Sequence, residues 1–318
     1  MKTPKVSVCI PAYQQPAGVA RALQSLLEQD YRDYEVIVTD DSADAAVEQV
    51  CREYAARLPL QYVRNTPPRG TPENWNVAMR AARGAYIKIL HHDDWFATPT
   101  ALGTLVRLLD AHPEADLAFC GSLNINSKGE LVNQRQLNDA QVQRLRHKPA
   151  LLFCGNLVGA PSATLFRRQA DLCFDPQFKW LVDIDFYIRL LARGRSLAYD
   201  AEPLISVTVA SPQQVTAGCT NNKDVEITEH LALYMKLLAA GQASLGVFNH
   251  LLNLCRCFGI ADEAAVRGCG YGGPIPAELR LYFSNHRLLQ RIEWCVQGLL
   301  MACVYGGARC LRPFRRRS

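Results

Sequence analysis

The chain has 318 residues, which is long enough for one large α/β domain with additions or for two domains of ordinary size. This length excludes a disulfide-stapled miniprotein. The composition of 49% hydrophobic and 20% charged residues is typical of a globular protein, and the sequence has neither the low complexity of a disordered chain nor the fixed repeat of a solenoid. The formal net charge of +5 is carried by the C-terminus, where five of the last ten residues are arginine. The rest of the chain is formally neutral, so we expect no nucleic-acid partner.

Short β-branched runs alternate with helical periodicity from residue 4 to about 120, which is the pattern of βα units on a mainly parallel sheet. The runs predict strands over residues 6–10, 34–39, 60–64, 85–90 and 116–120. The periodic segments predict helices over about 19–27, 43–54 and 71–83, and a further helix that begins at 98.

The pattern loosens after residue 121 into a polar connection over 124–143, a loop over 155–162 and a helix over 182–193. The last third is predicted to be helical, with segments over 225–240, 248–258 and 278–305 and a glycine-rich break over 268–273. We therefore expect two parts, a domain over residues 1–220 that binds a ligand at its sheet edge and a helical region with a basic tail over residues 221–318.

The twelve cysteines are scattered with no CxxC pair, which argues against a zinc domain. Several of them lie in apolar runs, where a reduced cysteine behaves as a small hydrophobic residue. The first residues lack the apolar stretch of a signal peptide, and no run of 18 apolar residues predicts a membrane-spanning helix. These features predict a cytoplasmic protein.

Two acidic pairs follow predicted strands at the points where those strands end. Asp40 and Asp41 follow the second strand, and Asp93 and Asp94 follow the strand over 85–90. Ligands of open α/β sheets bind outside the carboxyl ends of the strands. A carboxylate pair there can hold a divalent metal beside a diphosphate, although Asp94 could instead cap a turn while Asp93 stays solvated.

The chain resembles the inverting, GT-A fold glycosyltransferases of family 2 in five segments that follow the family's order: VSVCIPAYQQ, EVIVTDDSAD, RGTPENWNVAMRAARGAYIKILHHDDW, GAPSATLFRR and FKWLVDIDFYIRLLARG. The resemblance covers residues 5 to about 195. It implies a Rossmann-like, mainly parallel sheet flanked by helices, here with a helical C-terminal extension. It also implies transfer of a sugar from a nucleotide-diphosphate sugar, with UDP-sugar as the first candidate, to a hydroxyl of a glycan or lipid-linked glycan in polysaccharide biosynthesis.

The resemblance assigns the donor site to residues near the first two strand ends, the loop at residue 70 and the metal motif. These residues are Pro11, Ala12, Tyr13, Asp40, Asp41, Gly70, Asn74, Asn76 and Asp93. Asp40 would accept a hydrogen bond from the base. Gln14 replaces the asparagine of the family's PxYN turn, and the family's DDGS reads DDSA here. The alternative for Asn74 and Asn76 is that they are polar residues of a capped helix.

The metal that the resemblance implies is manganese or magnesium, bound by Asp94 with Asp93. The first aspartate of the family's DxD motif is His91 in this chain, and His92 follows it. An imidazole is a fair ligand for manganese, yet a histidine at a strand end is more commonly a packing residue. The sequence leaves open whether either histidine binds the metal.

The general base that the resemblance implies is Asp183, which would take the proton of the acceptor hydroxyl as that oxygen attacks. The glutamate that precedes this aspartate in the family is Val182 here, and Asp185 is the reserve candidate on the acceptor side. Pro161 and Ser162 would form an acceptor-side loop, and residues 214–216 a segment that closes over the diphosphate. Alternatively, both aspartates only stabilise the first turn of a helix.

Other functions are less consistent with the motifs. The chain has no GxGxxG after the first strand and no P-loop. A non-catalytic nucleotide-sugar-binding protein of the same fold is the alternative that His91 and Val182 favour, whereas the four retained aspartates at 40, 93, 94 and 183 argue against it.

The C-terminal residues suggest a membrane contact. Apolar residues from Leu288 to Cys303 recur at helical spacing, and five arginines follow. This combination predicts peripheral attachment to the anionic inner face of a membrane, which suits a lipid-linked acceptor. A helix packed on the catalytic domain with a solubilising tail is the equal alternative.

Overall fold

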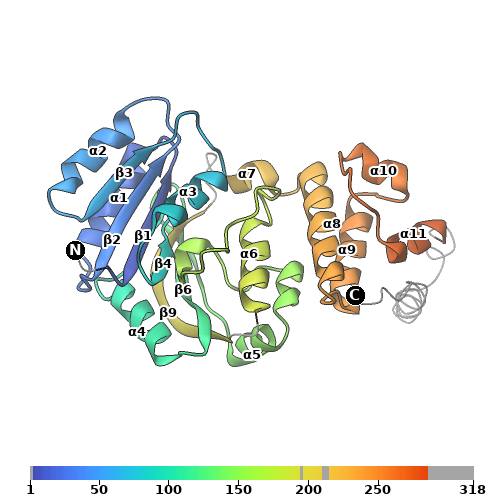
Figure 1. The fold of residues 1–318 in the computed structure, drawn as a ribbon. Coiled ribbons are helices and arrows are strands. Elements are labelled where there is room, and N and C mark those ends of the chain that lie inside the picture. The colour runs from blue at the N-terminus through green and yellow to red at the C-terminus, as the bar shows by residue number, and fades with distance from the viewer. Residues whose placement is uncertain (1–2, 194–195, 210–214, 286–318) are drawn as a thin grey trace. The chain divides into compact units, whose positions relative to one another are not determined.

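The computed structural model describes residues 3–193, 196–209 and 215–285 (Figure 1). The chain divides into two compact units. The first takes in residues 1–152 and 156–217, and the second takes in residues 153–155 and 218–318.

The first unit is built on a nine-stranded sheet with the order β3-β2-β1-β4-β8-β6-β9-β5, and β7 pairs with β6 outside this path. Four adjacent strands are parallel, namely β3 (Leu60–Arg64), β2 (Tyr34–Asp40), β1 (Val6–Ala12) and β4 (Tyr86–Ile89). The other strands are β5 (Trp95–Phe96), β6 (Ala115–Ile125), β7 (Leu131–Arg135), β8 (Thr164–Arg167) and β9 (Ser196–Thr208). β8 runs antiparallel to β4 and β6, whereas β6 and β9 are parallel. The mainly parallel α/β sheet confirms the predicted fold class.

Helices cover both faces of the parallel strands, which is why β1 and β2 are buried along their whole length. Val6, Val8 and Ile10 of β1 belong to one core cluster with side chains of α1, α2 and α4. Cys9, on the opposite face, is also buried, and α3 packs against β1 and β2. The helices of this unit are α1 (Pro16–Leu27), α2 (Ala46–Ala55), α3 (Glu73–Ala81), α4 (Ala101–Ala111), α5 (Asp139–His147) and α6 (Val182–Leu191).

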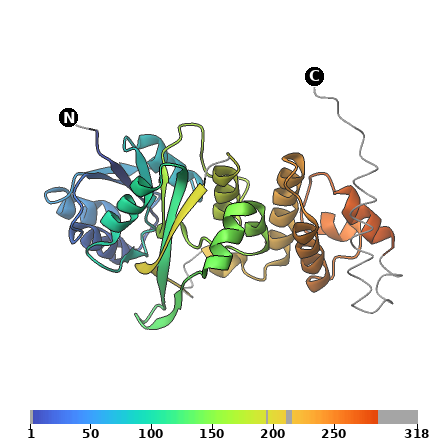
Figure 2. The same cartoon turned by 90° about the horizontal axis from the view of Figure 1, so that it is seen from below.

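The predicted polar connection over 124–143 is wrong. β6 continues to Ile125 and forms a hairpin with β7, which Figure 2 shows in green, extending beyond the sheet. β7 has no run of buried apolar residues because the strand is exposed along nearly its whole length, including Leu131 and Val132. α5 follows, and the Asn138 side chain accepts a hydrogen bond from the Gln141 main chain in a capping box.

The second unit is helical, with α8 (Lys223–Ala239), α9 (Leu245–Cys257), α10 (Glu263–Gly268) and α11 (Ala277–Ser284), while α7 (Val215–Cys219) spans the division between the units. α11 ends with Asn285 as its C-cap, and the rest of the helix predicted over 278–305 lies outside the described residues. The predicted membrane-contacting residues and the basic tail lie outside the described residues. Among the residues that are described, no helix is both long enough and apolar enough to span a bilayer.

Because His230 of the second unit is buried, we expect acid to lower the free energy of unfolding of this unit. His230 is 4% exposed, its Nδ1 lies 2.7 Å from the carbonyl oxygen of Glu226, and its ring packs edge-on against Phe153. Burial lowers the pKa of His230 to about 4. Because the unfolded imidazole titrates near pH 6.5, folding is favoured fully above that pH and less as the pH falls toward 4. We expect the free energy of unfolding to drop by about 2 kcal/mol between pH 7.5 and pH 5.

Hydrogen exchange of the α8 amides at the two pH values measures this effect. The variant His230→Phe should show a much smaller loss of protection at pH 5. His147→Gln, which changes an exposed histidine of the first unit, should behave as the unmodified chain does. An unchanged pH dependence in His230→Phe would assign the acid sensitivity to another group.

Candidate functional site

The turn that follows β4 lies at the carboxyl edge of the parallel strands. Leu90 continues the strand pairing, since its main-chain N–H donates to the carbonyl oxygen of Cys9 at 2.9 Å. The next residues reverse direction, and the N–H of Asp94 donates to the carbonyl oxygen of His91 at 3.0 Å. This turn is the edge at which ligands of open α/β sheets bind.

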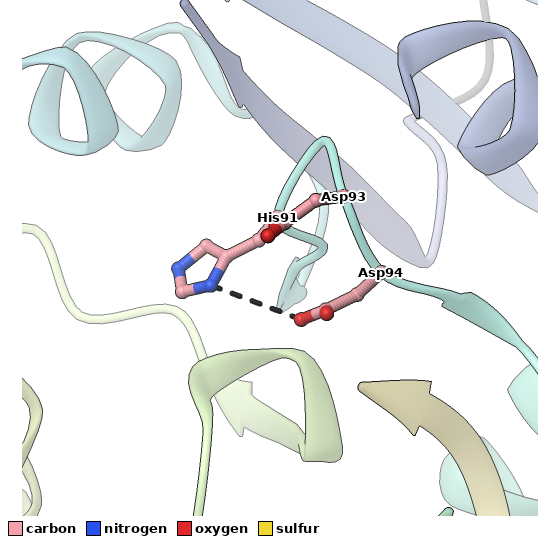
Figure 3. A group of neighbouring side chains, drawn as sticks. All are labelled: His91, Asp93 and Asp94. Atoms are coloured by element: carbon pink, nitrogen blue, oxygen red, sulfur yellow. Dashed lines mark ion pairs between the residues drawn. The ribbon is translucent and has the colours of Figure 1, made fainter. Parts of the chain in front are cut away.

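His91, Asp93 and Asp94 form a cluster in this turn (Figure 3). One ligand atom from each residue lies within 4.8 Å of the other two, and the Nδ1 of His91 is 3.8 Å from the Oδ2 of Asp94. Two carboxylates with one imidazole make a donor set that fits a divalent cation. The structure therefore brings the predicted metal residues together and adds His91 to them.

Asp94 is the most buried member of the cluster, at 1% exposure. Its Oδ1 accepts a hydrogen bond from the Thr208 N–H at 2.9 Å. Burial, with a smaller effect from the neighbouring Asp93, raises the pKa of Asp94 to about 8, although Ser162, Thr208 and Lys88 act in the opposite direction. An adjacent cation would oppose this shift, because it favours the ionised carboxylate.

Three residues that the sequence analysis did not assign to the site support the turn. Lys88 is fully buried in β4, and its Nζ donates to the carbonyl oxygen of Ser162. Arg21 of α1 donates to the carbonyl oxygen of Asp93 at 2.8 Å and lies over the Trp95 ring. The Thr208 hydroxyl donates to the same carbonyl oxygen. A lysine at a buried strand position was the one sequence signal that could have indicated this support.

Ser162 belongs to the support of the turn as well. It is fully buried in the short 3-10 helix Pro161–Ala163, and its Oγ accepts a hydrogen bond from the His91 N–H at 2.9 Å. Pro161 is buried too. Both residues are therefore buried in a short helix rather than in an open loop, and their acceptor-side role stays a prediction.

The second acidic pair holds the neighbouring loops. Asp40 is fully buried, with its Oδ1 accepting from the Ser42 N–H and its Oδ2 accepting from the Tyr62 hydroxyl, both at 2.8 Å. Asp41 accepts hydrogen bonds from the N–H groups of Arg69 at 3.0 Å and Gly70 at 2.7 Å. Gly70 has a φ of 72°, which glycine adopts without strain. Asp41 thus shapes the loop that leads into α3, whereas Asp40 ties the end of β2 to Tyr62 of β3.

The two asparagines of α3 form hydrogen bonds with the main chain of other segments. Asn74 donates from Nδ2 to the carbonyl oxygen of Ala12 at 3.1 Å. Asn76 donates to the carbonyl oxygen of Phe174 and accepts from its N–H, both at 2.8 Å. Since Asn76 is 1% exposed, the structure places it as a tether between segments far apart in sequence rather than at an open donor surface.

The end of β1 presents an aromatic side chain to solvent. The carbonyl oxygen of Pro11 lies 3.1 Å from the Nδ1 of His92, and that of Ala12 accepts from the Asp41 N–H at 3.0 Å. Tyr13 follows and is 55% exposed. Gln14 and the next residue adopt left-handed φ values of 55° and 53°, which are uncommon for residues with a side chain.

Asp183 lies in the first turn of α6 and is partly exposed. Its Oδ2 accepts a hydrogen bond from the Asn156 side chain at 2.7 Å, and its Oδ1 accepts from the Ile184 N–H at 2.8 Å. Burial raises the pKa of Asp183 to about 6, against the effect of these hydrogen bonds and of Arg135. A carboxyl that titrates near neutrality suits proton transfer.

Asp185 differs from Asp183 in both exposure and partner. It is 1% exposed, and its Oδ2 accepts from the Nε of Arg189 at 2.8 Å, one helical turn further on. Because the Asp185 carboxylate is buried and paired with Arg189, it is less available to an acceptor than Asp183, and the geometry favours Asp183 as the base.

One loop connects Asp183 with the cluster at β4. Asn156 holds Asp183, and Ser162, six residues later, holds the main chain of His91. Arg135 of β7 fixes the loop between them by donating to the carbonyl oxygens of residues 156, 157 and 158. Of the predicted segment over 214–216, residue 214 lies outside the described residues, and Val215 and Thr216 begin α7.

The sheet order and the cluster after β4 define a glycosyltransferase of the GT-A type. The chain belongs to glycosyl transferase family 2, whose family model matches residues 7–174. It is also similar to TarS 1-349 of S. aureus in complex with UDP-GlcNAc, with a TM-score of 0.62 and 17% identity over 98% of this chain and 93% of that one. The mannosyltransferase PcManGT of Pyrobaculum calidifontis, in complex with GDP-Man and Mn2+, gives a TM-score of 0.56 and 19% identity over 99% and 89% of the two chains. These likenesses confirm the GT-A fold.

Sequence relatives agree with the family. An uncharacterized glycosyltransferase of Haemophilus influenzae is 23% identical over 79% of this chain and 86% of its own length. The uncharacterized protein MT1568 of Mycobacterium tuberculosis is 34% identical over 60% of this chain. The match spans 63% of that protein, and a match to the uncharacterized protein y4gI of Sinorhizobium fredii spans 13% of the relative.

Proposed function

We propose that the protein is an inverting glycosyltransferase that moves a sugar from a nucleotide-diphosphate sugar, with UDP-sugar as the first candidate, to a hydroxyl of a glycan or lipid-linked glycan. The observation that carries this proposal is the loop over 156–162. It is hydrogen-bonded at one end to Asp183, whose pKa is raised to about 6, and at the other end to the main chain of His91 in the cluster that could bind a metal ion. A base and a site for a charged leaving group are the two parts that a single displacement needs.

Asp94 and Asp93, with His91, are the residues that would hold a manganese or magnesium ion. Such an ion would neutralise the charge that develops on the departing diphosphate. The complex of PcManGT with GDP-Man and Mn2+ supports this proposal for the present chain.

Asp183 is the proposed base. Its carboxylate would accept the proton of the acceptor hydroxyl while that oxygen attacks the anomeric carbon from the side opposite the nucleotide. Attack from that side inverts the configuration of the anomeric carbon in one step. Asn156 fixes one carboxylate oxygen, so the group is oriented before the acceptor arrives.

Tyr13 is proposed to stack on the nucleotide base, because it is an exposed aromatic residue at the end of β1. Asp40 and Asp41 would shape the same pocket through the loops that they hold. The complex of TarS with UDP-GlcNAc supports a uridine donor for this chain.

The Tyr13→Ala variant tests the stacking. We expect UDP to bind more weakly by about 1 to 3 kcal/mol, because an aromatic face contributes that much to holding a base. The thermal stability should not change, since the ring is largely in solvent. Calorimetric titration with UDP measures the affinity, and Tyr13→Phe is the matched control that keeps the ring. Equal affinities in the alanine variant and the unmodified chain would contradict the stacking.

A screen of UDP- and GDP-sugars with Mn2+ tests the proposed function itself. Release of the nucleoside diphosphate, with a product of inverted anomeric configuration by NMR, is the expected result. Tight binding of a nucleotide sugar without any turnover, across glycan and lipid-linked acceptors, would favour the non-catalytic alternative.

The remaining proposals concern organisation and location. We propose that residues 1–220 form the catalytic domain and that it acts in the cytoplasm. We also propose that the helical region over 221–318 attaches the protein to the inner face of the membrane, where a lipid-linked acceptor would lie. The arginines of the C-terminal tail support this membrane contact by their charge alone.

A further inference from the structure

We infer that His91 supplies a nitrogen ligand to the ion at the turn after β4, and that this nitrogen makes the site prefer Mn2+ to Mg2+. The inference rests on the proposed function, because it concerns the ion of the same site. It goes further in assigning a role to a residue at which this chain departs from the family's DxD motif.

The His91 ring is held in place without hydrogen bonds to its nitrogens from the described part of the chain. The Nε2 is buried and has no hydrogen-bond partner among those residues. The Nδ1 is 3.8 Å from the Oδ2 of Asp94, which is too far for a hydrogen bond. The ring instead packs against Trp75, with 4.7 Å between the ring centroids, and its main chain is fixed by Ser162.

The nitrogen that faces the carboxylates is Nδ1 (Figure 3). A neutral imidazole has one nitrogen with a free lone pair, which can bind a metal ion. Because no hydrogen bond from the described residues occupies Nδ1, a metal ion beside the two aspartates would take its lone pair.

The charges around the cluster limit its affinity for a hard cation. The carboxylates of Asp93 and Asp94 lie near two cationic side chains, Lys88 and Arg21, which offset their charge. A neutral imidazole in place of a third carboxylate adds no negative charge. The affinity of the site for a divalent cation therefore owes little to net charge and depends more on which ligand atoms the site offers.

Ligand type separates the two candidate ions. Mg2+ prefers oxygen ligands, demands near-ideal octahedral geometry and gives up its water reluctantly. Imidazole nitrogen is a better ligand for first-row transition ions, and Mn2+ is the one of these that also suits carboxylates. A site of two carboxylates and one imidazole should therefore select Mn2+.

Pulsed electron paramagnetic resonance of Mn2+ bound to the full chain with UDP tests the inference directly. We expect a nitrogen modulation from a coordinated imidazole, which disappears in His91→Gln and persists in His92→Gln. His92 is the matched control, because its Nε2 is also buried without a hydrogen-bond partner among the described residues, whereas its Nδ1 lies 3.1 Å from the Pro11 carbonyl oxygen and it is outside the cluster. Thermal denaturation of each variant shows whether it is folded.

A competition titration with Mg2+ provides the second readout and uses His91→Asp, which restores the motif. The preference for Mn2+ over Mg2+ should fall about tenfold in this variant. A nitrogen modulation that survives in His91→Gln, or a preference that His91→Asp leaves unchanged, overturns the inference. If Mn2+ with UDP binds and turnover occurs without any nitrogen modulation, only this inference fails. If no divalent ion binds the unmodified chain, the metal-dependent function fails with it.

Discussion

The Asp183→Asn variant is expected to lose at least about a hundredfold in turnover while its affinity for the donor stays the same. The substitution keeps the shape of the side chain, and its amide oxygen can still accept the hydrogen bond from Asn156. It removes only the ability to take a proton. Steady-state kinetics with saturating acceptor, together with calorimetric titration of UDP, separates the two quantities.

The same residue sets the expected pH dependence of the reaction. Because burial raises the pKa of Asp183 to about 6, the carboxyl is protonated and inactive well below that pH. Turnover should therefore rise as the pH increases through about 6 and then level off. This rising limb should be missing from the residual activity of Asp183→Asn.

Asp171→Asn is the matched control for this experiment, since Asp171 is an exposed aspartate that pairs with Arg193. It should keep normal turnover and the normal pH profile. A turnover number in Asp183→Asn within a factor of three of the unmodified chain would assign the base to another group.

The Asp94→Asn variant is expected to lose the thermal stabilisation that Mn2+ and UDP give together. A ligand that binds only the folded state at 100 times its Kd stabilises that state by about 2.7 kcal/mol. The amide oxygen can still accept from the Thr208 N–H, so the turn should remain folded. The charge that attracts the ion is gone, and the diphosphate loses its bridge to the protein.

Thermal denaturation with and without Mn2+ and UDP measures this loss. Asp139→Asn, which changes an exposed aspartate at the start of α5, should retain the full stabilisation. Undiminished Mn2+-dependent stabilisation in Asp94→Asn would show that Asp94 is not a principal ligand.

Strands β1, β2 and β4 of the parallel half could be predicted from the sequence because they are buried on both faces and are mainly apolar. Most of the remaining strands could not be predicted in the same way. β5 has only two residues, and β7 is an exposed strand in which two apolar residues precede three polar ones. β8 and β9 are defined by pairing with strands distant in sequence, and local periodicity carries no information on such pairing.

The site shows the same division. The proximity of Asp93 and Asp94 follows from their spacing, because adjacent residues at a strand end stay together whatever the rest of the chain does, whereas the sequence left open whether His91 belongs with them. Hydrogen-bond partners could not be predicted, since Lys88 and Ser162 meet across 74 residues of sequence. For that reason the buried position of Ser162 and the support from Lys88 appear only in the folded chain.

Lys88 and Arg21 affect the charge of the turn after β4 even without a bound ion. The turn after β4 already contains two cationic side chains close to its two carboxylates, so the acidic edge has its own counter-ions. The charge of this edge is therefore partly balanced by the protein's own side chains. Under the proposed function, binding of the ion and folding would be separate events, and a nucleotide product would leave with its ion while the edge of the sheet keeps its shape.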